Sequence, residues 1–388
     1  MEYKLEDLFD LQMGKTPARN NPEYWNSEDY KWISIGDLSR SGKYIQDTKE
    51  YLSKKAVDES GITIIPAGTV VMSFKLSIGK TAIVSEPMFS NEAIMSFRDK
   101  RVVDLLPDYI YYMFLGRDWD VGTNKAVMGK TLNKATLSKI KVRVHNITEQ
   151  KEIVQILDKV NAVIEARQLE LEKLDTLIKA RFVEMFGNPV ANEKGWKLAR
   201  LGDLATKIGS GATPKGGRES YGAEGISLIR SMNVHCGRFE NKELAHISDE
   251  QAARLENVTV ERQDVLLNIT GASVARCCVV PEDVLPARVN QHVCIIRCRE
   301  YISPGFLSNM LIDDNYQDLL WKIAGSGATR EAITKQQVEN LQIIVPPNEL
   351  QEQFVNFVAQ VDKSKAVIQK SLDETQLLFD SLMQKYFG

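Results

Sequence analysis

Apolar and polar residues alternate in two different periods along the chain. Short apolar runs rich in β-branched residues, such as 61–65, 69–72 and 264–267, are bounded by glycine, proline or charged residues and predict strands. Shorter helical patterns, such as the one over 108–114, are mixed among them. The sequence therefore predicts two α+β globular domains over 1–145 and 197–345, joined to the rest of the chain by segments of a different period.

Each globular part is followed by a segment in which apolar residues recur at alternating steps of four and three. This spacing is the heptad seam of a coiled coil. No glycine or proline interrupts 149–186, so that segment can form a helix about 55 Å long at ~1.5 Å per residue. We expect long helices over 146–187 and 346–388, with a linker over 188–196. The seam residues are Ile153, Leu157, Val160, Ile164, Leu171, Leu174 and Ile178 in the first helix, and Phe354, Val358, Val361, Ile368, Leu372, Phe379 and Leu382 in the second.

Two helices of equal length with matching seams are expected to pair. An antiparallel pair would carry the two globular domains at its opposite ends. The alternative is that each helix covers its own domain, although so narrow an apolar seam would bury poorly on a broad sheet.

The two halves of the chain are tandem copies of one another. Five motifs recur in the same order, at an offset of about 200 residues: 5–8 in 201–204, 14–17 in 211–214, 77–84 in 273–280, 91–94 in 290–293, and 185–187 in 386–388. Each motif alone is short, but the repeated order indicates a duplication.

Composition and charge narrow the class of protein. The chain is 43% hydrophobic and 26% charged, contains no long apolar run, and starts without a secretory signal, so we expect a cytoplasmic protein without membrane contact. Five cysteines without framework spacing agree with a reducing compartment. The formal net charge of −3 counts against DNA binding. However, 121–148 contains six lysines and arginines and no acid, so a local basic strip remains available.

Motifs that would indicate an enzyme fail on inspection. Asn21-Pro22-Glu23-Tyr24 resembles an amino-methyltransferase motif but has Glu in its third position and no glycine-rich strand turn upstream. Gly79-Lys80-Thr81 lacks the preceding glycine of a nucleotide-binding P-loop. The four histidines are isolated from one another. We therefore expect no catalytic and no metal-binding residues, and a binding module.

Taken together, the repeated motifs resemble the specificity (S) subunit of a type I restriction–modification system. The carriers are the Leu-x-Asp-Leu and Gly-x-Thr-Pro openings of both copies, the 66–83 stretch and its counterpart at 264–274, Asn91-Glu92 and Asn290-Gln291, and the Glu149-Gln150 and Leu350-Gln351 helix starts. The resemblance covers the whole chain. The second copy departs from the pattern at Ala275 and Arg276, and the first at Glu92, where glutamine is more typical.

This resemblance implies two target recognition domains that each read half of a split, asymmetric sequence in double-stranded DNA. The paired helices would act as a spacer and as the dock for two methyltransferase (M) subunits, joined by restriction (R) subunits for ATP-dependent cleavage. Methylation of adenine N6 and strand cutting would belong to those partners in the prokaryotic cytoplasm. This chain would then need no cofactor, and S-adenosylmethionine, ATP and Mg²⁺ would bind to the partner subunits.

DNA contacts are expected in three loop regions of each domain, where arginine and amide groups can read base edges and lysines can hold phosphates. In the first domain the candidates are Lys15, Thr16, Arg19, Ser73, Lys75, Ser77, Lys80, Asn124, Lys125, Lys130 and Asn133. In the second they are Thr213, Lys215, Arg218, Asn268, Thr270, Ser273, Arg276, Ser326, Thr329, Arg330 and Lys335.

Two other functions remain open from the sequence. The chain could be the recognition subunit of a bifunctional restriction–methylation enzyme, which the identity of its partner would reveal. It could also be a coiled-coil scaffold that does not read DNA, in which case it would show no sequence preference at physiological salt.

Overall fold

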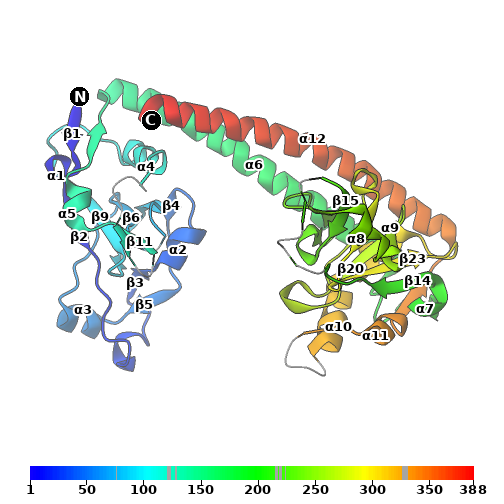
Figure 1. The fold of residues 1–388 in the computed structure, drawn as a ribbon. Coiled ribbons are helices and arrows are strands. Elements are labelled where there is room, and N and C mark those ends of the chain that lie inside the picture. Colours follow the sequence, from blue (N-terminus) through cyan, green and yellow to red (C-terminus); the bar gives the residue numbers. More distant parts are fainter. Residues whose placement is uncertain are drawn as a thin grey trace. The chain divides into compact units, whose positions relative to one another are not determined.

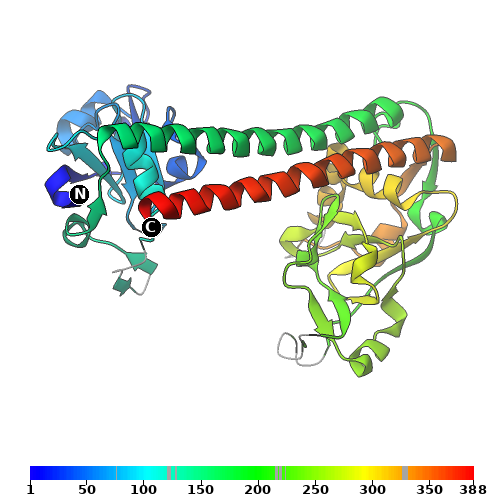
Figure 2. The same cartoon turned by 90° about the horizontal axis from the view of Figure 1, so that it is seen from above.

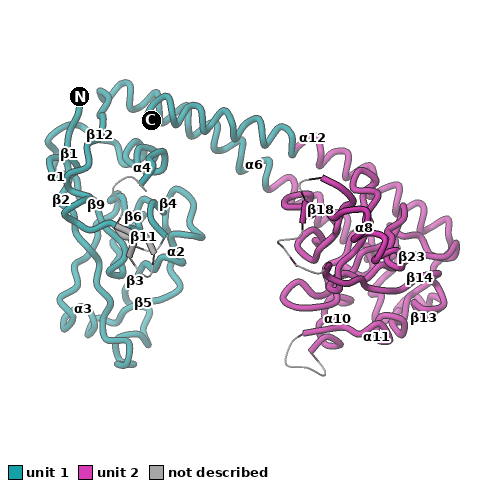
Figure 3. The backbone as a smooth tube through the Cα atoms, in the orientation of Figure 1, with its two compact units in different colours: residues 1–168, 369–388 teal, residues 169–368 magenta. Residues whose placement is uncertain are grey.

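A computed structural model describes residues 1–75, 77–119, 124–126, 129–214, 217, 221–222, 224–325 and 331–388, with the backbone alone over 124–126 and 129–131. The chain forms two compact units, residues 1–168 with 369–388 and residues 169–368 (Figure 3). Each unit therefore contains one globular domain and one part of each long helix.

The first unit is built around a central sheet of strand order β2-β9-β6-β7-β4 (Figure 1). Its strands are β2 (Phe9–Met13), β9 (Ile94–Asp99), β6 (Val70–Ser73), β7 (Thr81–Val84) and β4 (Tyr44–Ile45). Beside it lie a smaller sheet of β5 (Glu50–Leu52), β3 (Tyr30–Ile33) and β8 (Phe89–Ser90), and the pairs β1 (Glu2–Lys4) with β12 (Lys141–Arg143) and β10 (Asn124–Ala126) with β11 (Gly129–Thr131). The helices of this domain are α1 (Leu5–Leu8), α2 (Ile35–Arg40), α3 (Lys54–Ser60), α4 (Pro107–Leu115) and α5 (Lys134–Ser138), with the 3-10 turn η1 (Pro22–Tyr24).

The second unit repeats this plan with a central sheet of order β14-β23-β20-β21. Its strands are β14 (Ala205–Ser210), β23 (Val293–Cys298), β20 (Val265–Asn268) and β21 (Cys277–Val279). A second sheet contains β18 (Ala245–Ile247), β15 (Ile226–Ile229), β22 (Ala287–Val289) and β19 (Thr259–Val260), and the pairs are β13 (Lys197–Arg200) with β24 (Gln342–Val345) and β16 (Val234–His235) with β17 (Arg238–Phe239). Its helical elements are α7 (Leu201–Leu204), α8 (Asp249–Ala253), α9 (Pro304–Leu311), α10 (Asp314–Gly325), α11 (Lys335–Glu339), η3 (Ser231–Asn233), η4 (Glu256–Val258), η5 (Gly271–Ser273) and η6 (Glu282–Val284).

The duplication read from the sequence extends to strand pairing. In both units the central strands pair antiparallel in the same order, β2-β9-β6-β7 and β14-β23-β20-β21. The parallel pair β3–β8 likewise has its counterpart in β15–β22. The α+β fold with two tandem domains is thus confirmed.

Strands β6 and β20, inside the two central sheets, are mainly apolar because both of their faces are buried. Val70 and Met72 of β6 pack into the core that includes α4, whereas Val71 between them packs into the core of the opposite face. In the second unit Val265 and Leu267 of β20 pack with α9 and Leu266 packs on the other side. Covering the strands on both faces fixes the register of the sheet from which the loops of the domain emerge.

The two long helices are α6 (Ile147–Phe186) and α12 (Asn348–Phe387), against predicted bounds of 146–187 and 346–388. All of the seam residues named from the sequence are buried or half-buried. In the first unit Leu157 near the start of α6 shares a core with Phe379 near the end of α12. In the second, Phe182 near the end of α6 contacts Phe354 near the start of α12, with ring centroids 5.5 Å apart. The helices therefore pair antiparallel (Figure 2), as expected.

The helices also pack on the globular domains, so the alternative that each covers its own domain holds in part. On α6, Asp158 accepts a hydrogen bond from the Tyr112 hydroxyl of α4 at 2.6 Å. The C-terminal end of each long helix packs on the globular domain of the other copy. Phe186 of α6 contacts Phe306 of α9 with 4.8 Å between ring centroids, and Phe387 of α12 contacts Tyr109 of α4 with 5.4 Å between ring centroids. Each domain is thus seated on both helices.

A buried glutamine joins the first turn of each long helix to its domain. Gln150 is 0% exposed, its amide nitrogen donates to the carbonyls of Asp104 and His145 at 2.8 and 2.9 Å, and its oxygen accepts from the Leu106 amide at 3.0 Å.

In the second copy Gln351 is 1% exposed and does the same: its nitrogen donates to the carbonyls of Pro346 and Tyr301, and its oxygen accepts from the Ser303 amide at 2.8 Å. Three hydrogen bonds in each copy fix the angle at which the helix leaves the loop before α4 or α9.

We predict that Gln150→Ala and Gln351→Ala each lower the free energy of unfolding by about 1–3 kcal/mol, because buried backbone groups lose their partners. Urea denaturation followed by circular dichroism measures the loss. Gln155→Ala, at an exposed position of the same helix α6, is the matched control and should change stability little. Equal effects at positions 150 and 155 would contradict the anchoring role.

A second prediction concerns a backbone position that the copies fill differently. Gly79 has φ 89° and its counterpart Ala275 has φ 70°, a region that costs a residue with a Cβ roughly 1–2 kcal/mol. Both amides donate to the end of the preceding strand at 2.9 Å, Gly79 to the Ser73 carbonyl and Ala275 to the Asn268 carbonyl. The conformation is therefore imposed by the fold in both copies.

Ala275→Gly should change the stability of the chain little, because relief of about 1–2 kcal/mol of strain at a positive φ is offset by loss of a buried methyl worth about 0.8 kcal/mol and by the greater freedom of glycine in the unfolded chain. Gly79→Ala should lower it by about 1–2 kcal/mol, and its added Cβ would lie 3.0 Å from the Trp119 ring. The two urea midpoints check this contrast; an equal loss of stability in both variants would contradict it.

Candidate nucleic-acid interface

The loops singled out by the sequence emerge from one end of each central sheet. In the first domain this end is set by the register, which pairs Met13 with Met95, Ser73 with Ile94 and Met72 with Thr81. From it emerge what we call the opening loop (14–19, after β2), the hairpin loop (74–75 and 77–80, between β6 and β7) and the asparagine segment (91–93, before β9). The corresponding stretches of the second domain are 211–214, 269–276 and 290–292.

Main-chain hydrogen bonds join these stretches into one cluster. In the first domain the Gly14 amide donates to the Ile94 carbonyl at 3.1 Å and the Phe74 amide to the Ala93 carbonyl at 3.0 Å. The Phe74 carbonyl in turn accepts from the Leu132 amide at 3.1 Å. That last bond adds the pre-helix loop (132–133 before α5, 331–334 before α11).

The second domain repeats the pattern. Gly211 donates to the Asn290 carbonyl at 3.1 Å, Ile269 donates to the His292 carbonyl at 2.9 Å, and Ile333 donates to the Ile269 carbonyl at 2.8 Å. Because these bonds use backbone atoms, the cluster keeps its shape while its side chains differ between copies.

The glycine of the Gly-x-Thr-Pro motif is required by this arrangement. A Cβ on Gly14 would overlap the backbone oxygen of Ser90, and one on Gly211 would overlap that of Val289. The opening loop therefore passes directly against the asparagine segment in both domains, and a side chain at this position would push the two apart.

The threonine of the same motif links the two stretches through its side chain. The Thr16 hydroxyl donates to the Glu92 carboxylate, and the Thr213 hydroxyl donates to the Gln291 amide oxygen. The hydrogen bond from Thr16 holds the pKa of Glu92 below its usual range, and the nearby charges of Lys75 and Arg19 act in the same direction. Glu92 is therefore an exposed carboxylate that stays ionised.

The arginine and lysine candidates of the first domain whose side chains are described each contact another residue. The Arg19 guanidinium lies 3.9 Å from the Trp25 ring centroid and 4.7 Å from that of Trp32, and pairs with Glu50 with one N–O separation of 3.1 Å. Lys15 donates to the Ser60 carbonyl at 2.6 Å, Lys80 donates to the Ser39 hydroxyl at 2.5 Å, and Lys75 lies 5.3 Å from the Phe74 ring centroid.

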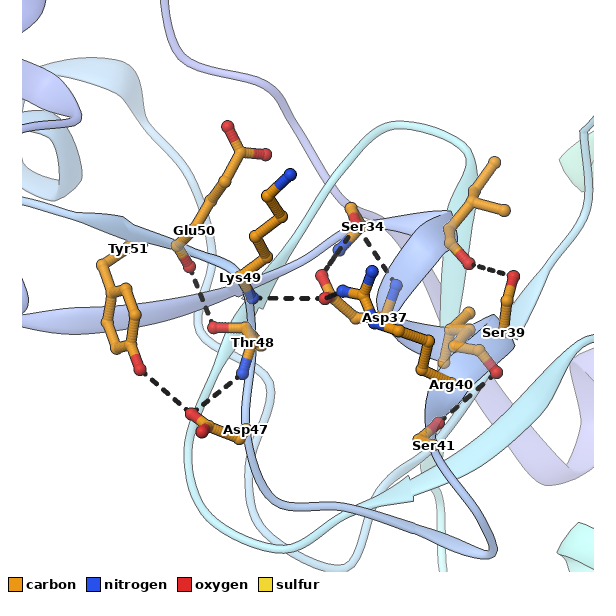
Figure 4. A network of polar contacts seen from close by, with 12 residues as sticks. Ser34, Asp37, Ser39, Arg40, Ser41, Asp47, Thr48, Lys49, Glu50 and Tyr51 are labelled. Carbon is orange, nitrogen blue, oxygen red and sulfur yellow. Dashed lines mark hydrogen bonds and ion pairs between the residues drawn. The ribbon is translucent and has the colours of Figure 1, made fainter. Parts of the chain in front are cut away.

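Ser39, the acceptor for Lys80, lies on α2 with Asp37, and Glu50, the partner of Arg19, directly follows Lys49; polar contacts of Asp37 connect these two stretches (Figure 4). The buried Asp37 carboxylate accepts from the Ser34 amide at 2.8 Å, from the Lys49 amide at 3.2 Å and from the Arg40 guanidinium at 2.6 Å. It thereby ties α2, which carries Ser39, to the stretch leading to Glu50. This network was not predicted from the sequence, although its members all lie within residues 34–51.

Two predicted DNA contacts are wrong. Ser73 and Asn268 are both 0% exposed. The Ser73 hydroxyl donates to the Ser77 carbonyl and accepts from the Lys80 amide at 3.1 Å, and the Asn268 amide donates to the Ser231 carbonyl at 2.8 Å. These side chains stabilise the hairpin loop and its surroundings from within, so they cannot face a ligand.

The remaining described candidates lie at or beside the cluster. Ser77 and Ser273 are half-buried in the hairpin loops, as is Arg276. Thr270 bonds to His292 Nδ1 at 2.5 Å, which links the hairpin loop to the asparagine segment. Asn133 caps α5 by accepting from the Thr136 amide at 2.8 Å, and Lys335 at the start of α11 pairs with Glu339 at 3.6 Å.

Several candidates lie outside the described residues. They are Lys215, Arg218, Ser326, Thr329 and Arg330, together with the side chains of Asn124, Lys125 and Lys130. Among the residues that are described, none gather into a group of three or more histidine, cysteine or acidic side chains able to hold a metal ion. No helix in the described part of the chain has the length and apolar character needed to cross a membrane.

Comparison with known proteins shows which family the chain resembles. The family model described as type I restriction modification DNA specificity domain matches residues 1–174 and again 193–376. The type I restriction enzyme MjaIX specificity subunit of Methanocaldococcus jannaschii is 24% identical, covering 98% of this chain and 91% of its own. The EcoR124I/EcoR124II specificity subunit of Escherichia coli is 28% identical over 41% of each chain.

Solved structures agree on the fold. The type I restriction–modification S subunit from M. genitalium superposes with a TM-score of 0.56 at 14% identity, covering 100% of this chain and 96% of its own. The two matches to one family model fall on the two copies that carry the same loop cluster. The chain therefore belongs to the type I restriction–modification specificity family, as a specificity subunit with two recognition domains.

Proposed function

We propose that this chain is a non-catalytic subunit that reads a split, asymmetric DNA target with its two loop clusters. The observation that carries the proposal is the duplicated cluster itself, held in one shape by backbone hydrogen bonds while its side chains differ. Lys75 of one hairpin loop is replaced by Thr270 in the other, and Glu92 is replaced by Gln291. Two identical frames with different side chains suit two different half-sites.

The methyl and nuclease chemistry then belongs to partner subunits. In this proposal two methyltransferase subunits dock on the chain and methylate adenine N6 with S-adenosylmethionine. Restriction subunits use ATP and Mg²⁺ for translocation and cutting. The work of this chain is to position those subunits on their target in the prokaryotic cytoplasm. A complex that purifies with one fused restriction–methylation polypeptide would instead support the bifunctional alternative.

The experiment that tests the function is co-expression of the chain with a candidate methyltransferase subunit, followed by sequencing of methylated adenines across a genome. We expect one motif with two unlike specified halves separated by unspecified bases. A palindromic motif would contradict different reading by the two domains. Absence of any methylation motif with a demonstrably assembled, active complex would favour a scaffold that does not read DNA.

The paired helices are proposed to set the number of unread base pairs between the half-sites. Each recognition domain is seated on this pair by Gln150 or Gln351 and by aromatic contacts, so a change in helix length should move the domains as rigid bodies. Asp175 of α6 and Lys365 of α12 mark facing positions, with 2.5 Å between carboxylate and ammonium. A heptad can thus be removed from both helices at matching places.

Deleting 168–174 together with 366–372 should shorten the spacer by about 10 Å. This corresponds to about three base pairs at ~3.4 Å each. The seam continues across both cuts because seven residues restore the heptad phase. Methylation mapping of the double deletion measures the new spacing, and deletion in α6 alone is the control that should disrupt pairing. If the double deletion folds and its target keeps the original number of unread base pairs, the proposal that helix length sets this number is refuted.

A further inference from the structure

One exposed position of the loop cluster differs in chemistry between the domains although its surroundings are the same. Glu92 and Gln291 both follow the asparagine of the asparagine segment, and both accept a hydrogen bond from the threonine of the opening loop. Asn91 and Asn290 take equivalent bonds too, accepting from the Ala93 and His292 amides at 3.0 Å each. The frame is therefore held constant, and the side chain alone changes.

An ionised carboxylate in this position constrains what can approach it. Glu92 accepts hydrogen bonds but has none to donate, and it would repel a phosphate. One hydroxyl donor, from Thr16, leaves acceptor capacity on the carboxylate. Among base edges in the major groove, the groups that donate are the amines of cytosine N4 and adenine N6, and a carboxylate is suited to cytosine because adenine also presents the N7 acceptor beside its amine.

The amide at the equivalent position has a different set of partners. Gln291 accepts from Thr213 with its oxygen, and its nitrogen lies 3.1 Å from His292 Nε2. When His292 carries its proton on Nδ1, toward Thr270, the ring Nε2 accepts one N–H of the amide. Both polar groups of Gln291 thus have partners within the loop cluster, and because glutamine is typical of this motif, its hydrogen bond with Thr213 belongs to the shared frame.

We propose that Glu92, where the first domain departs from the glutamine typical of this motif, is a specificity-determining residue that accepts from the exocyclic amine of one base, with cytosine favoured. This inference rests on the proposed function, because it assumes that the loop clusters face DNA. Thr16 and Thr213 are positioning residues in this scheme, since they orient the carboxylate and the amide.

The competing role for Glu92 is structural: it could join the opening loop to the asparagine segment and balance the charges of Lys75 and Arg19. Glu92→Gln separates the two roles. The variant keeps the shape and can still accept from Thr16, as Gln291 does from Thr213, but it loses the charge and gains a donor. Folding should be preserved because the side chain is exposed and the exchange copies the second domain.

The test uses the full chain assembled with its methyltransferase partner and a DNA pool in which the first half-site is randomised and the second is kept. For Glu92→Gln we expect the preference for cytosine at one base pair to weaken, with discrimination reduced roughly 5- to 100-fold. All other positions and the second half-site should keep their preferences. Gln291→Glu, with the second half-site randomised, should introduce a preference for cytosine at the corresponding base pair.

Glu86→Gln is the matched control. Glu86 is an exposed glutamate paired with Lys31 at 2.6 Å, and it follows β7 at the end of the sheet opposite to the loops. It undergoes the same chemical exchange and should leave every preference unchanged.

A uniform change in affinity with the base profile of Glu92→Gln unchanged would overturn the inference while the proposed function stands. A wild-type complex that selects no bipartite sequence from the pool would overturn both.

Discussion

The structure depends on the burial of the narrow apolar seams of α6 and α12. Neither seam is buried by the other helix alone. Residues of α6 and α12 that face one another also face α4 in the first unit and α9 in the second, where Tyr109 and Phe306 pack against the helix ends. A helix with a stripe this narrow gains most of its stability from such tertiary packing. As a result, neither globular core is complete without the ends of both long helices, and the buried amides of Gln150 and Gln351 fix the angle between each domain and the pair.

Because the helix ends complete each globular core, the side chains of the loop cluster can vary at little cost to the stability of the fold. The loop cluster is joined by backbone hydrogen bonds, and its two requirements on side chains are a glycine at position 14 or 211 and a threonine two residues later. The residues buried beneath it, Ser73 and Asn268, differ between copies, yet each forms hydrogen bonds that support the hairpin loop. Position 75, which is half-buried, and position 92, which is exposed, are not among these requirements and differ between the copies, as two unlike half-sites demand.

The features predictable from the sequence are those that repeat locally. Heptad spacing predicted the helices and their pairing, and the repeated motifs predicted the two domains. The direction of a polar side chain beside a strand was not predictable: Ser73 and Asn268 looked like exposed hydroxyl and amide groups, but each lies at the last position of a strand that is buried on both faces. Glu92 was noted only as a departure from a pattern, because its meaning depends on Thr16, which is distant in sequence. The contact of each helix end with the other copy's domain also had no local signal.

The overall charge of −3 is compatible with DNA reading because of where the acids lie. Arg19 and Lys335, beside the loop clusters, pair with Glu50 and Glu339 at exposed sites. Exposed ion pairs contribute only about 0–1 kcal/mol, so exchanging a carboxylate partner for a phosphate costs little on the protein side. The release of counterions from DNA is gained in full when a cation reaches a phosphate. Carboxylates that pair with these cations in the free protein therefore lower its net charge but leave the counterion release available for DNA binding. The stacking of Arg19 on Trp25 keeps the guanidinium oriented when its ion pair with Glu50 breaks.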